Sequence, residues 1–330
     1  MATQSKPERV FPATGKGPMR PCPLCGTTGN HLAVFEAGIE HRFDMPVLPV
    51  ADYGQALCSK CGLLYVNAPV SDEYLVELYS QENVEWQKQY LSEVSVVWNG
   101  GTTDEEWRRF STLADLVAKI RDIRKVRWMD FGCQTGELGE ILQKRYEVQM
   151  SGVDVSADYA AQADARWGGH KTARTSLDSF IAEGQKFDVV TAMETLEHIA
   201  TPWETVASFR KVLTPEGLLV VTVPSAQYFK LKYHVFKAYR SIFNRQRVRE
   251  SVGSKGRSMF GLCHTHPYNF SPASLELLLK RGGFSTFYIG GIGWSTRFWL
   301  PSAIARGIAI LTGGRVQIFP SVIAVARISN

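Results

Sequence analysis

The sequence predicts an α/β fold in which a doubly wound, mostly parallel sheet follows a small N-terminal cysteine-containing module. From about Val126, four apolar runs of strand length alternate with amphipathic helical segments. Apolar strands alternating with amphipathic helices indicate a parallel sheet that is covered by helices on both faces. The second observation is a pair of C-x2-C motifs within the first 61 residues, which predicts the metal-binding module.

Length and composition agree with this architecture. The chain has 330 residues, of which 45% are hydrophobic and 21% charged, which is enough for one large domain and a small one. The first twenty residues are polar and rich in Pro and Gly, without the apolar core of a signal peptide. The longest apolar stretch contains Pro301 and Arg306 and is shorter than the roughly 20 residues that span a bilayer. We therefore expect a cytoplasmic protein.

The elements are expected in a definite order along the chain. Helices are expected first, over 71–80 and 103–123, where the N-terminal acidic residues and the apolar periodicity fit helical geometry. Strands are then expected at 126–132, 149–155, 187–194 and 217–224, with helices between them at 137–145, 157–166 and 203–213. A helix over 271–284, with Ser271 as its N-cap, and a strand over 320–328 complete the sheet. The predicted organisation is a flexible arm (1–19), a zinc-ribbon module (20–70), a helical cofactor cover (71–125) and a main domain (126–330) with a basic insert at 226–262.

Four of the six cysteines form the two C-x2-C pairs, Cys22 with Cys25 and Cys58 with Cys61. Each pair places two thiolates on a tight turn, and four soft sulfur ligands suit tetrahedral Zn²⁺ with no position left open for chemistry. A module of roughly 50 residues is too small to be held by apolar burial alone, so the metal would be structural. The alternative is a set of four reduced cysteines without a ligand.

The segment "WMDFGCQTGELGEIL" (128–142) places a glycine-rich loop between the first strand and helix of the sheet, where α/β sheets bind nucleotides. Gly132 and Gly136 are present, but Gln134 occupies the middle position, so the G-x-G-x-x-G spacing of dinucleotide sites is absent. No Lys-Ser/Thr pair follows, which excludes a P-loop. A cofactor without phosphates fits such a loop, and Asp154 at the tip of the second strand can accept both hydroxyls of a ribose.

These segments, together with "FDVVTAMETLEHI" and "LTPEGLLVVTVPS", resemble the class I S-adenosylmethionine-dependent methyltransferases, which have a Rossmann-like fold. The resemblance covers about Val126 to Pro224, and "CPLCG…CSKCGLLYVNAPVSDEYLVELY" is similar to the branch that carries an N-terminal zinc ribbon. The family loop is usually D-x-G-C-G-x-G, from which this sequence departs at Gln134. The resemblance implies a cofactor site made of Asp130, Gly132, Cys133, Gly136, Asp154, Val155, Leu177 and Met193.

The motif "METLEHI" places Glu194, Glu197 and His198 at i, i+3 and i+4, which share one face on a helical turn. O-methylation requires removal of the acceptor's proton, by a base or through a metal-lowered pKa. The E-x-x-E-H pattern resembles ubiquinone-pathway O-methyltransferases and small-RNA terminal 2′-O-methyltransferases, both of which use Mg²⁺. The latter take a further histidine from a downstream segment, for which His266 stands at the right spacing and His264 is the neighbouring alternative.

We predict His198, His266 and Glu194 as catalytic residues, and Glu194, Glu197, His198 and His266 as ligands of a second, divalent metal. The alternative is that Glu197 and His198 only fix the start of a helix by hydrogen bonds.

Positive charge is concentrated between Tyr228 and Arg257, where nine Lys and Arg face one Glu. This segment has a net charge of +8, whereas the whole chain has a net charge of +5. The remainder of the chain therefore carries −3. Its aromatic stripe predicts an amphipathic helix that serves as a lid for an anionic acceptor. Peripheral contact with a membrane surface and a merely solvated helix face are the alternatives.

The predicted function is O- or C-methylation of a small glycosyl or aromatic metabolite. One alternative is an RNA methyltransferase that holds RNA with the basic insert and the zinc ribbon. The other is a non-catalytic binding scaffold that has lost its cofactor site. Only Gln134, in place of the middle glycine of the loop, supports this interpretation.

Overall fold

The structure is a computed structural model that describes residues 20–28, 31–34, 55–67, 71–79, 104–169, 172–231, 234–235, 267–292 and 302–329. Several predictions fall outside these ranges. They are the N-terminal arm, residues 80–103 of the helical cover, most of the basic insert, and the two histidines at 264 and 266.

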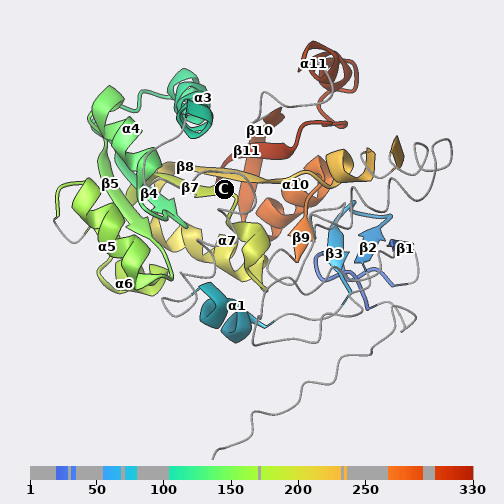
Figure 1. Ribbon diagram of the computed structural model, residues 1–330, viewed down its shortest axis with the longest axis horizontal. Helices are drawn as coiled ribbons and strands as arrows, with labels where there is room; N and C mark the ends of the chain where they lie inside the picture. Colours follow the sequence, from blue (N-terminus) through green and yellow to red (C-terminus); the bar gives the residue numbers. More distant parts are fainter. Residues whose placement is uncertain are drawn as a thin grey trace, which may run out of the picture.

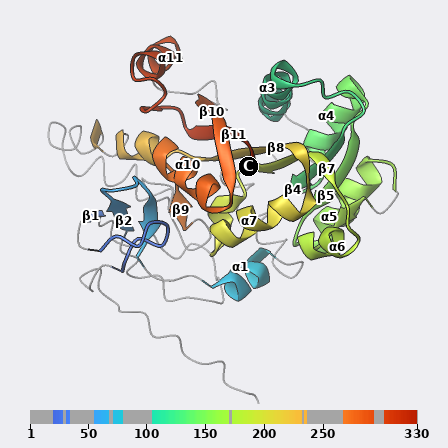
Figure 2. The ribbon, with the colours of Figure 1, turned by 180° about the vertical axis from the view of Figure 1, so that it is seen from behind.

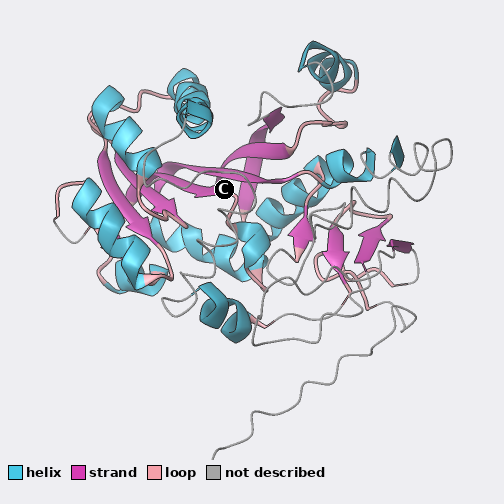
Figure 3. Cartoon of the chain, viewed as in Figure 1, coloured by secondary structure: helices cyan, strands magenta, loops and turns pink. Residues whose placement is uncertain are grey.

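A seven-stranded mixed sheet forms the centre of the protein, in the spatial order β10-β11-β8-β7-β4-β5-β6 (Figures 1 and 3). β4, β5, β6, β7 and β8 pair in parallel, whereas β11 runs antiparallel to both of its neighbours. The strands are β4 (Arg127–Phe131), β5 (Gln149–Val153), β6 (Ala173–Arg174), β7 (Phe187–Met193), β8 (Leu213–Pro224), β10 (Phe284–Ile292) and β11 (Ser321–Ile328). The order reverses at β4, so the carboxyl ends of β4 and β7 open onto the crevice where such sheets bind ligands.

Helices cover both faces of the sheet, as the apolar strands require. One buried cluster joins one set of strand residues to α6 (Leu177–Ala182), α7 (Pro202–Val212) and α10 (Pro272–Arg281). The other cluster joins the opposite set to α3 (Asp104–Ile120), α4 (Glu137–Tyr146) and α5 (Ala157–Arg166). Figure 1 shows α3 and α4 on one side of the sheet and α7 and α10 on the other. The doubly wound architecture predicted from the sequence is therefore confirmed.

The predicted elements agree with the structure to within a few residues. The side chain of Ser271 accepts a hydrogen bond from the backbone N–H of Ser274, which confirms Ser271 as the N-cap of α10. The sequence prediction omitted β10, because Gly290 and Gly291 interrupt its apolar pattern. A Cβ added at Gly291 would lie 2.2 Å from the ring of Phe319, so the missing side chain makes room for that ring.

The cysteine-containing module forms a second, antiparallel sheet in the order β1-β2-β3-β9. Its strands are β1 (His31–Val34), β2 (Gln55–Cys58), β3 (Leu64–Val66) and β9 (Tyr268–Asn269). The last strand follows β8 in the chain, far in sequence from the other three, and leads into α10. Figure 2 shows these strands side by side at one end of the molecule. The module is thus continuous with the main domain through β9.

Candidate functional site

The loop between β4 and α4 is fixed by backbone hydrogen bonds to the end of the neighbouring strand. The N–H groups of Gly132 and Cys133 both donate to the carbonyl of Val153, at 2.7 and 3.0 Å. The N–H of Gln134 donates to Oδ2 of Asp154 at 2.9 Å, and the N–H of Ser156 donates to Oδ1 at 3.0 Å. Each carboxylate oxygen of Asp154 is therefore held by one backbone donor and keeps acceptor capacity for a ligand.

Three residues of this loop, Gly132, Gln134 and Gly136, adopt left-handed backbone conformations. Gly132 has φ 78°, and a Cβ there would lie 2.4 Å from Oγ1 of Thr195. Gln134 has φ 46° and an exposed side chain. A left-handed conformation costs a residue with a side chain roughly 1 kcal/mol. The position that lacks glycine in this sequence thus keeps the backbone conformation that a glycine would adopt most easily.

The indole of Trp167 packs against Gly136 and leaves no room for a side chain at that position. A Cβ at Gly136 would lie 3.0 Å from Trp167, and one at Gly139 would lie 2.3 Å from it. Nε1 of Trp167 donates to the carbonyl of Gly136 at 2.8 Å. A Cβ at Gly152 would lie 2.7 Å from Sγ of Cys133, so that thiol also points into the packed interior. Cys133 is buried, which raises the pKa of its thiol, and the contact with Gly152 turns the side chain away from the crevice.

Two buried carboxylates lie at the ends of the adjacent strands. Oδ1 of Asp130 accepts a hydrogen bond from Oγ1 of Thr191 at 2.7 Å, and the side chain is 4% exposed. Burial raises the pKa of Asp130 to about 7 and that of Asp154 to about 6. The hydrogen bond from Thr191 opposes this rise at Asp130, and the backbone donors oppose it at Asp154. Both groups are consequently suited to accept hydrogen bonds from a ligand that brings its own donors.

The segment after β7 departs from the regular helical turn that the spacing predicted. Glu194 has φ 49°, and its N–H donates to the carbonyl of Thr222 at 2.9 Å. The helical turn is a 3-10 turn, η2, of only Leu196–His198. Oγ1 of Thr195 donates to the carbonyls of Met193 and Phe131, so this turn lies against the end of β4. The expectation of one shared helical face is wrong here, because the left-handed residue breaks the turn before it begins.

His198 and Glu197 form the polar part of this segment. Nε2 of His198 lies 3.9 Å from Oε1 of Glu197, whose side chain is fully buried. Burial raises the pKa of Glu197 to about 7, while charge on His198 and on Arg109 lowers it. The nearby Arg109 comes from α3, so this helix also contributes charge to the crevice.

Helix α1 (Asp72–Tyr79) supplies two contacts that sequence reasoning missed. Oη of Tyr79 lies 2.7 Å from Nδ1 of His198. Asp72 accepts hydrogen bonds from the N–H of Ala200 at 2.9 Å and from Oγ1 of Thr201 at 2.8 Å. The sequence marked Asp72 only as an acidic residue of a first helical turn. No signal marked Tyr79, because its partner lies 119 residues away.

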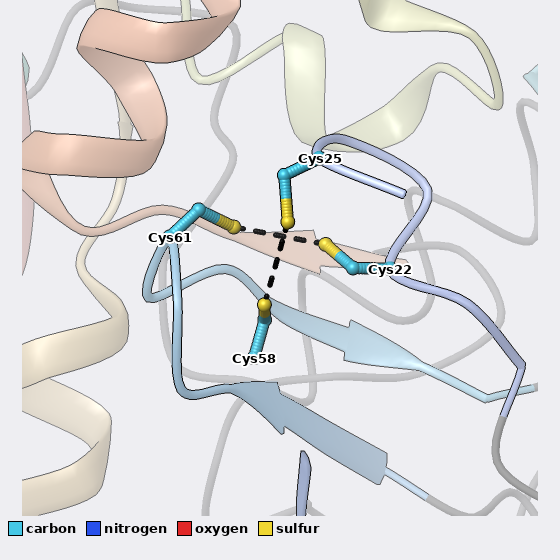
Figure 4. A group of neighbouring side chains, drawn as sticks. All are labelled: Cys22, Cys25, Cys58 and Cys61. Carbon is cyan, nitrogen blue, oxygen red and sulfur yellow. Dashed lines mark hydrogen bonds between the residues drawn. The ribbon is translucent and has the colours of Figure 1, made fainter. Parts of the chain in front are cut away.

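The four cysteines converge from two turns, as Figure 4 shows. Sγ of Cys22 lies 3.6 Å from that of Cys61, and Sγ of Cys25 lies 3.6 Å from that of Cys58. The edge of a tetrahedron of sulfur around zinc measures about 3.8 Å, given a Zn–S bond of about 2.3 Å. The observed separations fit that site and are far too long for disulfide bonds. The thiol of Cys61 lowers the pKa of Cys22 to about 5, so one thiolate forms readily.

In the described part of the chain, these cysteines are the group of three or more metal-binding side chains whose ligand atoms converge. Glu194, Glu197 and His198 form no such group there. Because the remaining predicted ligand, at position 266, lies outside the described residues, the second metal site stays a prediction.

The predicted cofactor residues all lie at the carboxyl edge of the parallel strands. Asp130 ends β4, and Gly132, Cys133 and Gly136 lie in the loop that follows it. Asp154 and Val155 follow β5, Leu177 begins α6 after β6, and Met193 ends β7.

Comparison with known proteins decides the family. Residues 105–288, more than half of the chain, match a family described as a methyltransferase domain. The chain belongs to this methyltransferase family. With its seven-stranded sheet it is a class I S-adenosylmethionine-dependent methyltransferase that carries a four-cysteine cluster near its N-terminus.

Curated relatives match the methyltransferase domain over about a hundred residues. A ubiquinone biosynthesis O-methyltransferase from Roseobacter denitrificans is 32% identical over 108 residues, which are 32% of this chain and 43% of the relative. The protein of the same name from a Caulobacter species is 35% identical over 104 residues, 29% of this chain and 40% of that protein. The match thus spans less than half the length of these relatives.

Among solved structures, magnesium protoporphyrin IX methyltransferase from Synechocystis PCC 6803 is 15% identical with a TM-score of 0.49. The alignment covers 78% of this chain and 99% of that one. An S-adenosylmethionine-dependent methyltransferase from Clostridium acetobutylicum is 11% identical with a TM-score of 0.45, over 76% of this chain and 99% of that one.

Proposed function

We propose that this methyltransferase transfers the methyl group to a hydroxyl oxygen of a small aromatic or glycosyl metabolite. The observation that carries the proposal is the contact of 2.7 Å between Tyr79 and Nδ1 of His198. It orients an imidazole beside the end of β7, where the acceptor meets the cofactor in our proposal. The curated relatives are O-methyltransferases, which supports oxygen over carbon as the acceptor atom.

The cofactor would be held at the carboxyl edge of β4 and β5. Asp154 is held in place by two backbone donors and would accept the ribose hydroxyls. The loop from Gly132 to Gly136 would approach the ligand with its backbone, because the side chain of Cys133 is turned into the interior. Asp130, Val155, Leu177 and Met193 complete the proposed cofactor site.

Bound S-adenosylmethionine supplies an electrophilic methyl group on a sulfonium. For His198 to act as the base, Nδ1–H would donate to Oη of Tyr79, and Nε2 would carry the lone pair that accepts a proton. Nε2 would then take the proton of the acceptor hydroxyl while that oxygen accepts the methyl group that the bound cofactor supplies. The carboxylate of Glu197, 3.9 Å from Nε2, would stabilise the imidazolium that forms.

Glu194 and the histidine at 266 remain candidates for the same proton or for a divalent cation such as Mg²⁺. If a metal lowers the pKa of the acceptor, Glu194→Gln and Glu197→Gln should abolish the response of turnover to added Mg²⁺. Unchanged turnover and an unchanged response in both variants would exclude the metal.

RNA is the competing acceptor class, and the basic segment between Tyr228 and Arg257 is the feature that favours it. RNA binding should weaken steeply as salt rises, because each phosphate contact releases counterions. A small metabolite should show a much weaker salt dependence. Neutralising Arg245, Arg247 and Arg249 would raise the KM of an anionic acceptor without changing cofactor affinity.

The zinc-loaded full chain should be titrated calorimetrically with S-adenosylhomocysteine, the product form of the cofactor. We expect saturable binding that falls about 100-fold or more in Asp154→Ala, because two ribose hydrogen bonds to a charged acceptor are lost. Asp122→Ala removes a carboxylate that is exposed and serves as the matched control. Absence of binding in the folded wild type, or full binding by Asp154→Ala, would overturn the proposed donor site.

A further inference from the structure

Helix α11 (Ser302–Leu311) presents an aliphatic outer face to solvent. The exposed fractions of Ile304, Ile310 and Leu311 are 51%, 79% and 87%. The inner face of the helix is packed against the protein, because Ala305 is buried and forms a small cluster with Ile318 and Phe319. The outer aliphatic residues are therefore not needed to hold the helix in place.

The position of α11 leaves this face accessible. The helix stands out from the body of the molecule beyond the end of β10 in both opposite views (Figures 1 and 2). A reversal of the chain follows it, in which Gly313 and Gly314 have φ 58° and 80°. The hydroxyl of Thr312 donates to the carbonyl of Ile308 and accepts from the N–H of Val316. The tip of the projection is thus a defined structure.

The surrounding sequence is strongly basic. From Leu277 to Asn330 there is no Asp or Glu, whereas there are six Lys and Arg. Five of these are described and exposed, among them Arg306 on α11 and Arg315 just after it. The tip therefore combines aliphatic side chains with positive charge and lacks any acidic residue that would repel an anionic surface.

We propose that the tip of α11, with Ile304, Ile310, Leu311, Arg306 and Arg315, docks the enzyme on an anionic lipid bilayer. Aliphatic side chains insert at the level of the acyl chains while basic groups contact lipid phosphates. Within the described residues no helix is long and apolar enough to cross a membrane, so this contact would be peripheral. The proposal concerns a surface apart from the crevice and does not depend on the acceptor.

Two other partners fit this face less well. A stable interface with a second copy buries roughly 1,000 Å² or more, and three aliphatic side chains along one short helix supply a fraction of that area. RNA would be contacted through basic and aromatic groups, since bases stack on aromatic rings. The exposed Ile and Leu side chains of the tip offer no such platform.

Flotation of the full-length, zinc-loaded protein with vesicles tests the proposal. We expect co-flotation with vesicles of phosphatidylcholine and phosphatidylglycerol, and little with phosphatidylcholine alone. Ile310→Glu combined with Leu311→Glu should lower the partition coefficient about tenfold or more, because it removes aliphatic contacts and adds repulsion. Val76→Glu places one such negative charge on α1, at a residue that is 51% exposed, and it should float like the wild type.

A second pair of substitutions separates charge from folding. Arg306→Glu with Arg315→Glu should also reduce flotation, and all variants should keep the wild-type melting temperature, because the changed residues are exposed. Wild type that fails to float, or equal flotation of the Ile310/Leu311 variant, overturns the proposal. A wild-type dimer that this variant makes monomeric assigns the face to a second copy. If the wild type binds RNA but not vesicles, and the Ile310/Leu311 variant loses the RNA binding, the face is assigned to RNA. Both of these outcomes overturn the proposal.

Discussion

The two sides of the crevice are held by different kinds of contact. On the donor side, the loop after β4 bonds to Val153 and Asp154, which lie about twenty residues away in the next strand. On the acceptor side, the segment from Glu194 to Thr201 is held by Asp72 and Tyr79 of α1 and by Tyr268 of β9. These partners lie 128, 119 and 68 residues away in sequence.

This difference makes the acceptor side more dependent on the rest of the fold. Contacts between distant residues carry a larger loop-closure cost and must be supported by other packing. Tyr268 donates to the carbonyl of Ala200 and pairs through its strand with Tyr65 of β3. The sheet of the cysteine module is therefore coupled to the acceptor side, whereas the hydrogen bonds of the donor loop run, within the described residues, to the end of β5 and to α4 and α5.

Removal of the metal should have the largest effect. A structural zinc site contributes about 10 kcal/mol to the folding of its module. We expect Cys58→Ser with Cys61→Ser to lose zinc, measured by elemental analysis, and to lose acceptor turnover, while S-adenosylhomocysteine affinity stays within about threefold. Hydrogen exchange should rise at 194–201 more than at 132–136. Parallel loss of cofactor affinity would contradict the asymmetry of the two sides.

A pH effect on stability should follow from Asp130, whose ordinary pKa of 3.8 rises to about 7 on folding. Because folding disfavours the ionised form of Asp130, ionisation of this carboxyl lowers the free energy of unfolding. This loss is absent below the pKa of 3.8 in the unfolded state and complete above about pH 7. The ligand-free enzyme should lose stability as pH rises from about 4 to about 7, by a few kcal/mol at most. Denaturant titrations should show a smaller loss in Asp130→Asn. If the free energy of unfolding fell equally with pH in the wild type and in Asp130→Asn, Asp130 would ionise with its ordinary pKa in the folded state.

Tyr79→Phe removes the hydroxyl that orients His198 but keeps the ring and its edge contact, where the centroids lie 5.2 Å apart. We expect kcat to fall about 10- to 100-fold, within the range that general-base catalysis contributes. S-adenosylhomocysteine affinity should not change, and the pH profile of kcat should shift. Tyr288→Phe, on the edge strand β10, is the control. A fall in cofactor affinity instead of kcat would assign Tyr79 to the donor side.

Gln134→Gly should give the smallest effect. It relieves a left-handed conformation but loosens the unfolded chain, so we expect stabilisation of up to about 1 kcal/mol. Cofactor affinity should rise or stay equal, because the loop keeps its conformation. Glu147→Gly relaxes a similar conformation, with φ 56°, at the end of α4. This control substitution should raise the free energy of unfolding without changing the calorimetric affinity for S-adenosylhomocysteine. Weaker cofactor binding by Gln134→Gly would show that the Gln134 side chain contacts the ligand.

Local pattern sufficed for five of the seven strands of the main sheet and for most of its helices. Ser271 was predictable as an N-cap because its hydroxyl bonds to a residue three positions away. β10 was not, since Gly290 and Gly291 interrupt its apolar pattern, and the space beside Gly291 is taken by Phe319 and Gln317 of another segment. Gly136 was predictable as a loop glycine, but its reason, the indole of Trp167, is a contact between α4 and the end of α5.

The sequence by itself determined the doubly wound sheet, the four-cysteine cluster and the order of strand, glycine loop and terminal acid, because each depends on spacing within a strand, helix or turn. Only the tertiary structure decided what holds His198, where the thiol of Cys133 points and which sheet β9 joins. Those features depend on residues more than 60 positions apart, or on side chains that meet across the core, and no local spacing encodes such a meeting.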